Sequence, residues 1–193
     1  SGKTYPMLSL PNVGNGASSM LRELMERYAD GFSASARPRY WAFVTGGSTP
    51  AALMGDWIAS TVDQNAADPN SSATHIELEA LAMLRQLFGL SDCHEGSFVT
   101  GATMSNFVGL DIGRQWVGHQ HNVNIAQEGL ASLPAPIKVL SAVPHSSVYK
   151  ACSMLGLGRN AVQKIKTLPD RESMDLAALE EVLIDIGQAG QHC

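Results

Sequence analysis

The fold prediction starts from the segment Gly96-Ser97-Phe98-Val99-Thr100-Gly101-Ala102-Thr103-Met104-Ser105-Asn106. Residues 97–100 are strand-like and end at Gly101, and the pattern behind them predicts a helix from Thr103 to about Gly118. The first amide N–H groups of such a helix lack partners, and the positive end of its dipole attracts anions. The sequence therefore leaves two interpretations of this turn, an ordinary capped turn or a phosphate site.

The C-terminal half repeats the alternation of strand and helix. The clearest strand of the chain is predicted at 137–143, followed by a helix that ends near Gly156, and a further strand is predicted at 162–168. Asp175 is placed to cap a last helix with an apolar stripe. The order β-α-β-α-β-α predicts an α/β fold, with a parallel sheet flanked by helices.

A histidine follows the clearest strand, in Pro144-His145-Ser146-Ser147. Ligands of open α/β sheets bind beyond the carboxyl ends of the strands, which is where both His145 and the Gly101 turn are expected. His145 could stack on a planar ring, act as an acid or base, or only cap the next helix. All three roles stay open on the residues alone.

The N-terminal part is predicted to be helical. An apolar stripe predicts a helix over 17–30, the aromatic run 40–44 is expected to be extended, and Thr49-Pro50 starts a helix apolar enough to be buried. Thr74 and Glu77 have the spacing of a capping box for a helix that stops at Gly89. We therefore expect an N-terminal helical segment over 1–90 and a second domain over 91–193.

Composition limits the kinds of binding partner and the cellular compartment that we expect for this chain. The chain has 193 residues, a net charge of −5 and 16% charged residues, against about 25% in typical domains. Its basic residues are scattered, which argues against nucleic acid, and no apolar stretch reaches the roughly 18 residues of a membrane span. Cys93, Cys152 and Cys193 form no CxxC pair, so we expect a cytoplasmic protein. His119-Gln120-His121 has no Cys or carboxylate nearby, so no metal site is expected.

Several motifs in order resemble the group II pyridoxal-phosphate-dependent amino-acid decarboxylases, in their N-terminal portion. The glycine-rich stretch 96–106 is similar to the family's G-x-F-x-S-G-G-T-x-A-N segment, with Ala102 and Ser105 as small departures. The other matching segments are 37–43 (RPRYWAF), 45–51 (TGGSTPA), 77–79 (ELE), 145–147 (HSS) and 155–158 (LGLG). This resemblance implies that residues 91–193 are the first, incomplete part of the large parallel or mixed-sheet domain of the aspartate-aminotransferase-like (type I) fold.

The resemblance also implies a cofactor, pyridoxal 5'-phosphate (PLP), and roles for matched positions. The cofactor phosphate would bind at Ala102, Thr103 and Met104, largely through backbone N–H groups, and the ring would stack on His145, the implied catalytic residue. Thr45 and Phe43 would lie near the carboxylate of an amino-acid substrate, so the resemblance makes 1–90 the N-terminal helical segment and substrate-loop region. A homodimer, or a second half-chain, is the implied protein partner.

The implied reaction is decarboxylation of an L-amino acid by a carboxy-lyase. PLP chemistry needs a lysine for the Schiff base and an acidic group at the pyridine nitrogen. In the family both follow the region matched here, and neither Lys164 nor Lys166 fits the family's lysine motif. The alternatives are a non-catalytic or incomplete fragment that binds phosphate or PLP and needs a C-terminal half, or another PLP lyase or transaminase.

Overall fold

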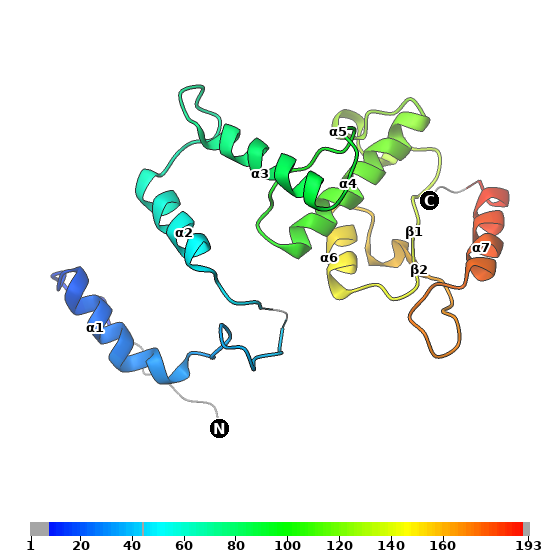
Figure 1. The fold of residues 1–193 in the computed structure, drawn as a ribbon. Coiled ribbons are helices and arrows are strands. Elements are labelled where there is room, and N and C mark those ends of the chain that lie inside the picture. Colours follow the sequence, from blue (N-terminus) through cyan, green and yellow to red (C-terminus); the bar gives the residue numbers. More distant parts are fainter. Residues whose placement is uncertain (1–7, 44, 191–193) are drawn as a thin grey trace. The chain divides into compact units, whose positions relative to one another are not determined.

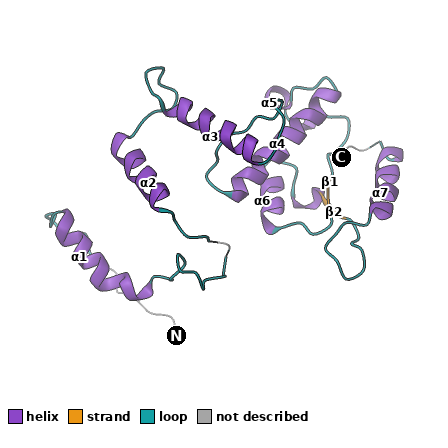
Figure 2. Ribbon diagram, in the orientation of Figure 1, coloured by secondary structure: helices purple, strands orange, loops and turns teal. Residues whose placement is uncertain are grey.

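The computed structural model describes residues 8–43 and 45–190. The chain divides into two compact units, Ser1–His75 and Ile76–Cys193, and each is described by itself. Figure 1 gives the course of the chain, and Figure 2 shows that helices dominate both units. The division predicted from sequence, at residue 90, stays a prediction.

The first unit contains two long helices, α1 (Ala17–Tyr28) and α2 (Pro50–Val62), and a short 3₁₀ turn, η1 (Ala29–Gly31). The predicted start of α2 is confirmed, because the Thr49 hydroxyl accepts a hydrogen bond from the Ala52 amide at 3.2 Å and Pro50 is the first helical residue. Pro fits there because the amide it lacks would have no partner in the helix.

Two expectations for this unit are wrong. The apolar side chains of α2 are not buried within the described chain, because Leu53, Met54, Trp57, Ile58 and Val62 are between 44% and 69% exposed. The run 40–43 forms no strand: Tyr40 and Trp41 have no regular structure, Ala42 lies in a bend, and Phe43 lies in a turn with a left-handed backbone (φ 58°). Val44, the last residue of that run, lies outside the described residues.

Helix α3 (Ala73–Leu87) crosses from one unit into the other. The predicted capping box is wrong, because Thr74 lies inside the helix and its hydroxyl donates to the carbonyl of Ala66 at 2.8 Å. The predicted stop at Gly89 (φ 65°) is confirmed. The Gly89 amide donates a hydrogen bond to the carbonyl of Gln86, and the Leu90 amide donates one to the carbonyl of Arg85. This pair of bonds is a Schellman motif, which uses a left-handed glycine to satisfy the last carbonyls.

The second unit contains a two-stranded parallel sheet of β1 (Val139–Ser141) and β2 (Val162–Lys164), with Val139 opposite Val162. The strand expected at 97–100 does not form within the described residues. The amide of Phe98 instead donates to the Glu77 carboxylate at 3.0 Å, so a side chain takes the place of a neighbouring strand. The predicted α/β pattern is thus realised only in part, as a mostly helical structure with a small parallel sheet.

Four further helices follow α3 in the described part of this unit. They are α4 (Ala102–Gln120), α5 (Ile125–Glu128), α6 (Ser146–Met154) and α7 (Leu176–Gln188), with 3₁₀ turns η2 (Leu130–Ser132) and η3 (Arg159–Ala161) between them. The predicted cap of α7 is confirmed, because the Asp175 carboxylate accepts hydrogen bonds from the amides of Ala177 and Ala178. A buried cluster of Val117, Ile125 and Ile137 joins α4, α5 and the segment before β1. This cluster fixes the C-terminal end of α4.

Candidate functional site

The first turn of α4 presents backbone amides that no side chain caps. Its N-cap residue is Gly101, in an extended conformation, and no side-chain hydrogen bond caps the helix. The first amide bonded within the turn is that of Ser105, which donates to the Gly101 carbonyl at 3.0 Å. A Cβ added at Gly101 would meet no atom within 4 Å, so the approach is open. The predicted positions Ala102, Thr103 and Met104 carry the amides that an anion could accept from.

His145 is the N-cap residue of α6. Its Nδ1 atom accepts a hydrogen bond from the Ser147 amide at 3.2 Å and lies 2.8 Å from the Ser147 hydroxyl. Helix capping, one of the three roles left open by the sequence, is therefore what His145 does in this structure. The cap uses only Nδ1, and the side chain is exposed, so the rest of the ring is accessible.

Two hydrogen bonds join α4 to α6. The Asn106 amide group donates from Nδ2 to the Ser147 hydroxyl at 2.7 Å, and the Arg114 guanidinium donates to the Leu155 carbonyl at 2.8 Å. Arg114 also forms an ion pair with Asp111 at 2.5 Å. The first bond lies near the start of α6 and the second at its end, as the close approach of the two helices in Figure 1 illustrates.

The spacing of these bonds gives the direction of the helices. The donors, Asn106 and Arg114, are eight residues apart on α4, and the acceptors, Ser147 and Leu155, are eight residues apart on α6. Eight helical residues span about 12 Å, so the two helices run parallel. The uncapped amides of α4 and the His145 ring therefore lie at the same end of the helix pair.

The two positions expected near the substrate belong to the first unit. Phe43 is 88% exposed in a turn, and Thr45 lies exposed in a segment without regular structure. Each is described only within that unit, so their role near a substrate carboxylate stays a prediction.

Sequence reasoning missed two residues that the structure brings to this site, Asn106 and Ser147. Both lie in segments that resemble the family, 96–106 and 145–147, but the sequence predicted a role for neither. A serine two positions after a histidine at a helix start is a weak signal for side-chain capping. The bond from Asn106 crosses 41 positions of sequence, and no local pattern predicts it.

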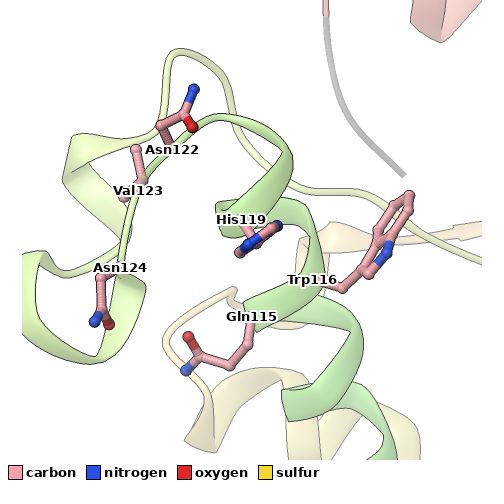
Figure 3. A pocket seen from close by; sticks show the side chains of 6 residues that line it. All are labelled: Gln115, Trp116, His119, Asn122, Val123 and Asn124. Carbon is pink, nitrogen blue, oxygen red and sulfur yellow. The ribbon is translucent and has the colours of Figure 1, made fainter.

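A separate hollow of about 620 Å³ lies at the far end of α4. Figure 3 shows its lining residues, with Trp116 pointing away from the loop that carries Asn122, Val123 and Asn124. Its only titratable lining side chain is His119, and none of the predicted site residues takes part. The hollow therefore lacks the charged groups that a phosphate or an amino acid would need.

The two described cysteines differ in environment. Cys152 is fully buried in α6, and this burial raises the pKa of its thiol, whereas Cys93 is exposed. Over residues 8–43 and 45–190, no cluster of three or more His, Cys, Asp or Glu side chains is arranged to hold a metal ion. The same residues include no helix with the length and apolar character of a membrane span.

Comparison with known proteins gives a family match over nearly the whole chain. Residues 7–192 match the model of the pyridoxal-dependent decarboxylase conserved domain. The chain is 27% identical over 161 residues to an aromatic-L-amino-acid decarboxylase of Bacillus atrophaeus, covering 82% of this chain and 31% of that protein. It is 29% identical over 135 residues to an L-2,4-diaminobutyrate decarboxylase of Acinetobacter baumannii, covering 64% of this chain and 26% of that protein. The chain thus spans about a third or less of the length of these relatives.

Solved structures agree on the fold. The glutamate decarboxylase domain of a Vibrio parahaemolyticus diaminobutyrate-pyruvate transaminase and L-2,4-diaminobutyrate decarboxylase superposes with a TM-score of 0.86 at 24% identity, over 95% of this chain and 41% of that one. An Oryza sativa structure described as TDC with PLP and tryptamine gives a TM-score of 0.79 at 23% identity, over 96% and 41%. The likeness covers the described fold, and the family match covers almost every residue. The chain belongs to the pyridoxal-dependent decarboxylase family, of the group II type, and corresponds to part of its fold.

Proposed function

We propose that this chain supplies the phosphate-binding and ring-binding part of a PLP-dependent L-amino-acid decarboxylase. The observation that carries the proposal is the parallel arrangement of α4 and α6, which brings uncapped amides and an accessible imidazole to one end of a helix pair. A phosphate and a planar ring, the two parts of PLP that need separate binding groups, match these two features.

The residues fit this cofactor. The amides of Ala102, Thr103 and Met104 would donate to the phosphate, helped by the positive end of the α4 dipole, and Gly101 leaves room for its approach. The His145 ring would stack on the pyridine ring, since its own cap occupies only Nδ1. When bound, PLP supplies an electron sink for the electron pair left as carbon dioxide departs.

Thr45 and Phe43 are proposed to lie near the substrate carboxylate, in a region that would be completed by the large domain of the aspartate-aminotransferase-like fold. The two relatives named above act on aromatic amino acids and on diaminobutyrate, which supports an amino acid as substrate without selecting one. The homodimer stays a prediction that a mass measurement in solution tests.

A proline substitution tests the phosphate site directly. Ala102→Pro removes one of the three amide donors at the first helical position, where proline is tolerated. Loss of one hydrogen bond to a charged group costs about 1.5–3 kcal/mol, so PLP binding should weaken about ten- to a hundredfold. Isothermal titration with PLP and with inorganic phosphate measures both affinities, and both should fall.

Ala17→Pro is a matched control. Ala17 is likewise the first residue of a helix, follows a glycine, and starts a helix that no side chain caps. The Ala17→Pro substitution should leave PLP affinity unchanged. Equal PLP affinity of the Ala102→Pro chain and the unsubstituted chain would refute the phosphate site.

Turnover is tested separately from binding. Carbon dioxide release from amino acids by this chain would exclude the alternative of a non-catalytic fragment. PLP binding without such release would favour that alternative. A screen for amine against keto-acid product separates a decarboxylase from a transaminase.

A further inference from the structure

We propose that Ser147 and Asn106 are positioning residues that hold the neutral His145 imidazole in one tautomer, with the proton on Nε2. The tautomer follows from contacts within this chain. Only the use of the ring for cofactor binding rests on the proposed function.

Ser147 lies at the centre of this arrangement. It is 3% exposed, and a buried hydroxyl is costly unless it is hydrogen-bonded. Its Oγ atom lies 2.7 Å from Asn106 Nδ2 on one side and 2.8 Å from His145 Nδ1 on the other. The Ser147 hydroxyl therefore connects the Asn106 side chain on α4 to the His145 ring at the start of α6.

The protons in this bridge can be assigned from what each group is able to do. An amide nitrogen such as Asn106 Nδ2 only donates, so the Ser147 hydroxyl accepts from it and turns its own proton towards His145. The backbone amide of Ser147, 3.2 Å from Nδ1, also only donates. Because two donors face Nδ1, that atom carries a lone pair, and a neutral ring must carry its proton on Nε2.

The bonds to Nδ1 limit rotation of the imidazole, and the accessible Nε2–H edge is a hydrogen-bond donor. The same bridge fixes the start of α6 to the first turns of α4. A ring held this way meets a planar ligand without first losing rotational freedom, which is the benefit of a preorganised site.

The first test is the tautomer itself. The chain is labelled with ¹⁵N-histidine, and its ring nitrogens are observed by NMR at a pH where histidine is neutral, with His145→Gln used to identify the signals of His145. We expect Nδ1 to show the signal of an unprotonated nitrogen and Nε2 that of a protonated one. A protonated Nδ1 in the unsubstituted chain would overturn the proposal.

Three variants then test the bridge. Ser147→Ala removes the hydroxyl, and Asn106→Asp replaces the donor with an acceptor that draws the serine proton away from Nδ1. Each should lower the ratio of the Nε2–H to the Nδ1–H form about two- to tenfold, the equivalent of one ordinary hydrogen bond. Ser147→Thr keeps the hydroxyl and should restore the ratio. Ser153→Ala removes an exposed hydroxyl of the same helix and should change nothing.

Cofactor binding gives the second readout. Ser147→Ala should weaken binding of PLP by a similar factor but leave binding of inorganic phosphate unchanged, because the ring and not the α4 amides is disturbed. Unchanged tautomer ratios in both Ser147→Ala and Asn106→Asp would overturn the proposal. If the tautomer is as expected but the chain does not bind PLP, the positioning pair stands and the proposed function fails.

Discussion

Gly118 occupies a position in α4 that has no room for a side chain. A Cβ added there would lie 2.7 Å from the carbonyl oxygen of Val123 and 2.7 Å from Cγ1 of Ile125. The Gly118 carbonyl accepts hydrogen bonds at 2.9 Å from the amides of His121 and Val123, so the chain folds back directly over the glycine. The loop that would have to move is backbone, which cannot rotate away as a flexible side chain could. Gly118→Ala should therefore strain the cluster around Ile125.

The expected magnitude is the balance of two effects. Alanine is favoured over glycine inside a helix by up to about 1 kcal/mol, while overpacking a buried position costs about 1–3 kcal/mol. The net change for Gly118→Ala should be a loss of up to about 2 kcal/mol in the free energy of unfolding. Gly113, five residues earlier in α4, has no atom within 4 Å of an added Cβ. Gly113→Ala should therefore keep the helical gain and raise stability.

Urea unfolding followed by far-ultraviolet circular dichroism measures both variants. A change in the midpoint at constant slope reports a change in stability alone. The difference between the two variants isolates the overpacking cost, because both carry the same substitution in the same helix. Equal stabilisation by Gly118→Ala and Gly113→Ala would refute the close packing of Gly118 against the Val123 loop.

Two further predictions concern a helix end and the cysteines. Gly89→Ala places a side chain at φ 65° in the Schellman motif of α3 and should lower the free energy of unfolding by about 1 kcal/mol, measured by the same urea assay; no loss would contradict the left-handed turn. Iodoacetamide should label Cys93 well before Cys152 in the native chain, because the thiolate is the reactive form and burial both shields Cys152 and raises its pKa. Peptide mass mapping locates the label, urea should abolish the difference, and equal native rates would show that Cys152 is accessible.

The features predicted correctly from sequence depend on neighbours within one helical turn. Thr49 and Asp175 cap helices through amides two or three residues away. At Gly89 the helix ends through the carbonyl three residues before Gly89 and the carbonyl five residues before Leu90. The hydrogen bonds that define these helix ends join groups only a few residues apart, so the local sequence contains both the donor and the acceptor. The start of α4 behind Gly101 and the helix behind His145 were predictable for the same reason.

The features predicted wrongly depend on partners that local sequence does not identify. A strand at 97–100 needs a neighbouring strand for its amides, and the described chain offers the Glu77 side chain to Phe98 instead. The apolar content of α2 indicates that burial would be favourable, but burial requires another surface against it, and within the described residues none covers Trp57 or Ile58. Thr74 matched the capping-box spacing, yet the helix begins one residue earlier. The Thr74 hydroxyl instead donates a hydrogen bond to the carbonyl of Ala66.

The candidate site combines both kinds of information. Its two ends, the α4 amides and His145, are local features that the sequence located, whereas their placement at one end of a helix pair depends on bonds from Asn106 and Arg114 that each cross 41 positions. The bond from Asn106 also reaches the serine that binds His145, so one long-range contact both aligns the helices and orients the ring. A substitution at Asn106 should therefore affect the imidazole more than the first turn of α4. The amides of that turn depend on the backbone of α4, which the Ile125 cluster secures at its other end.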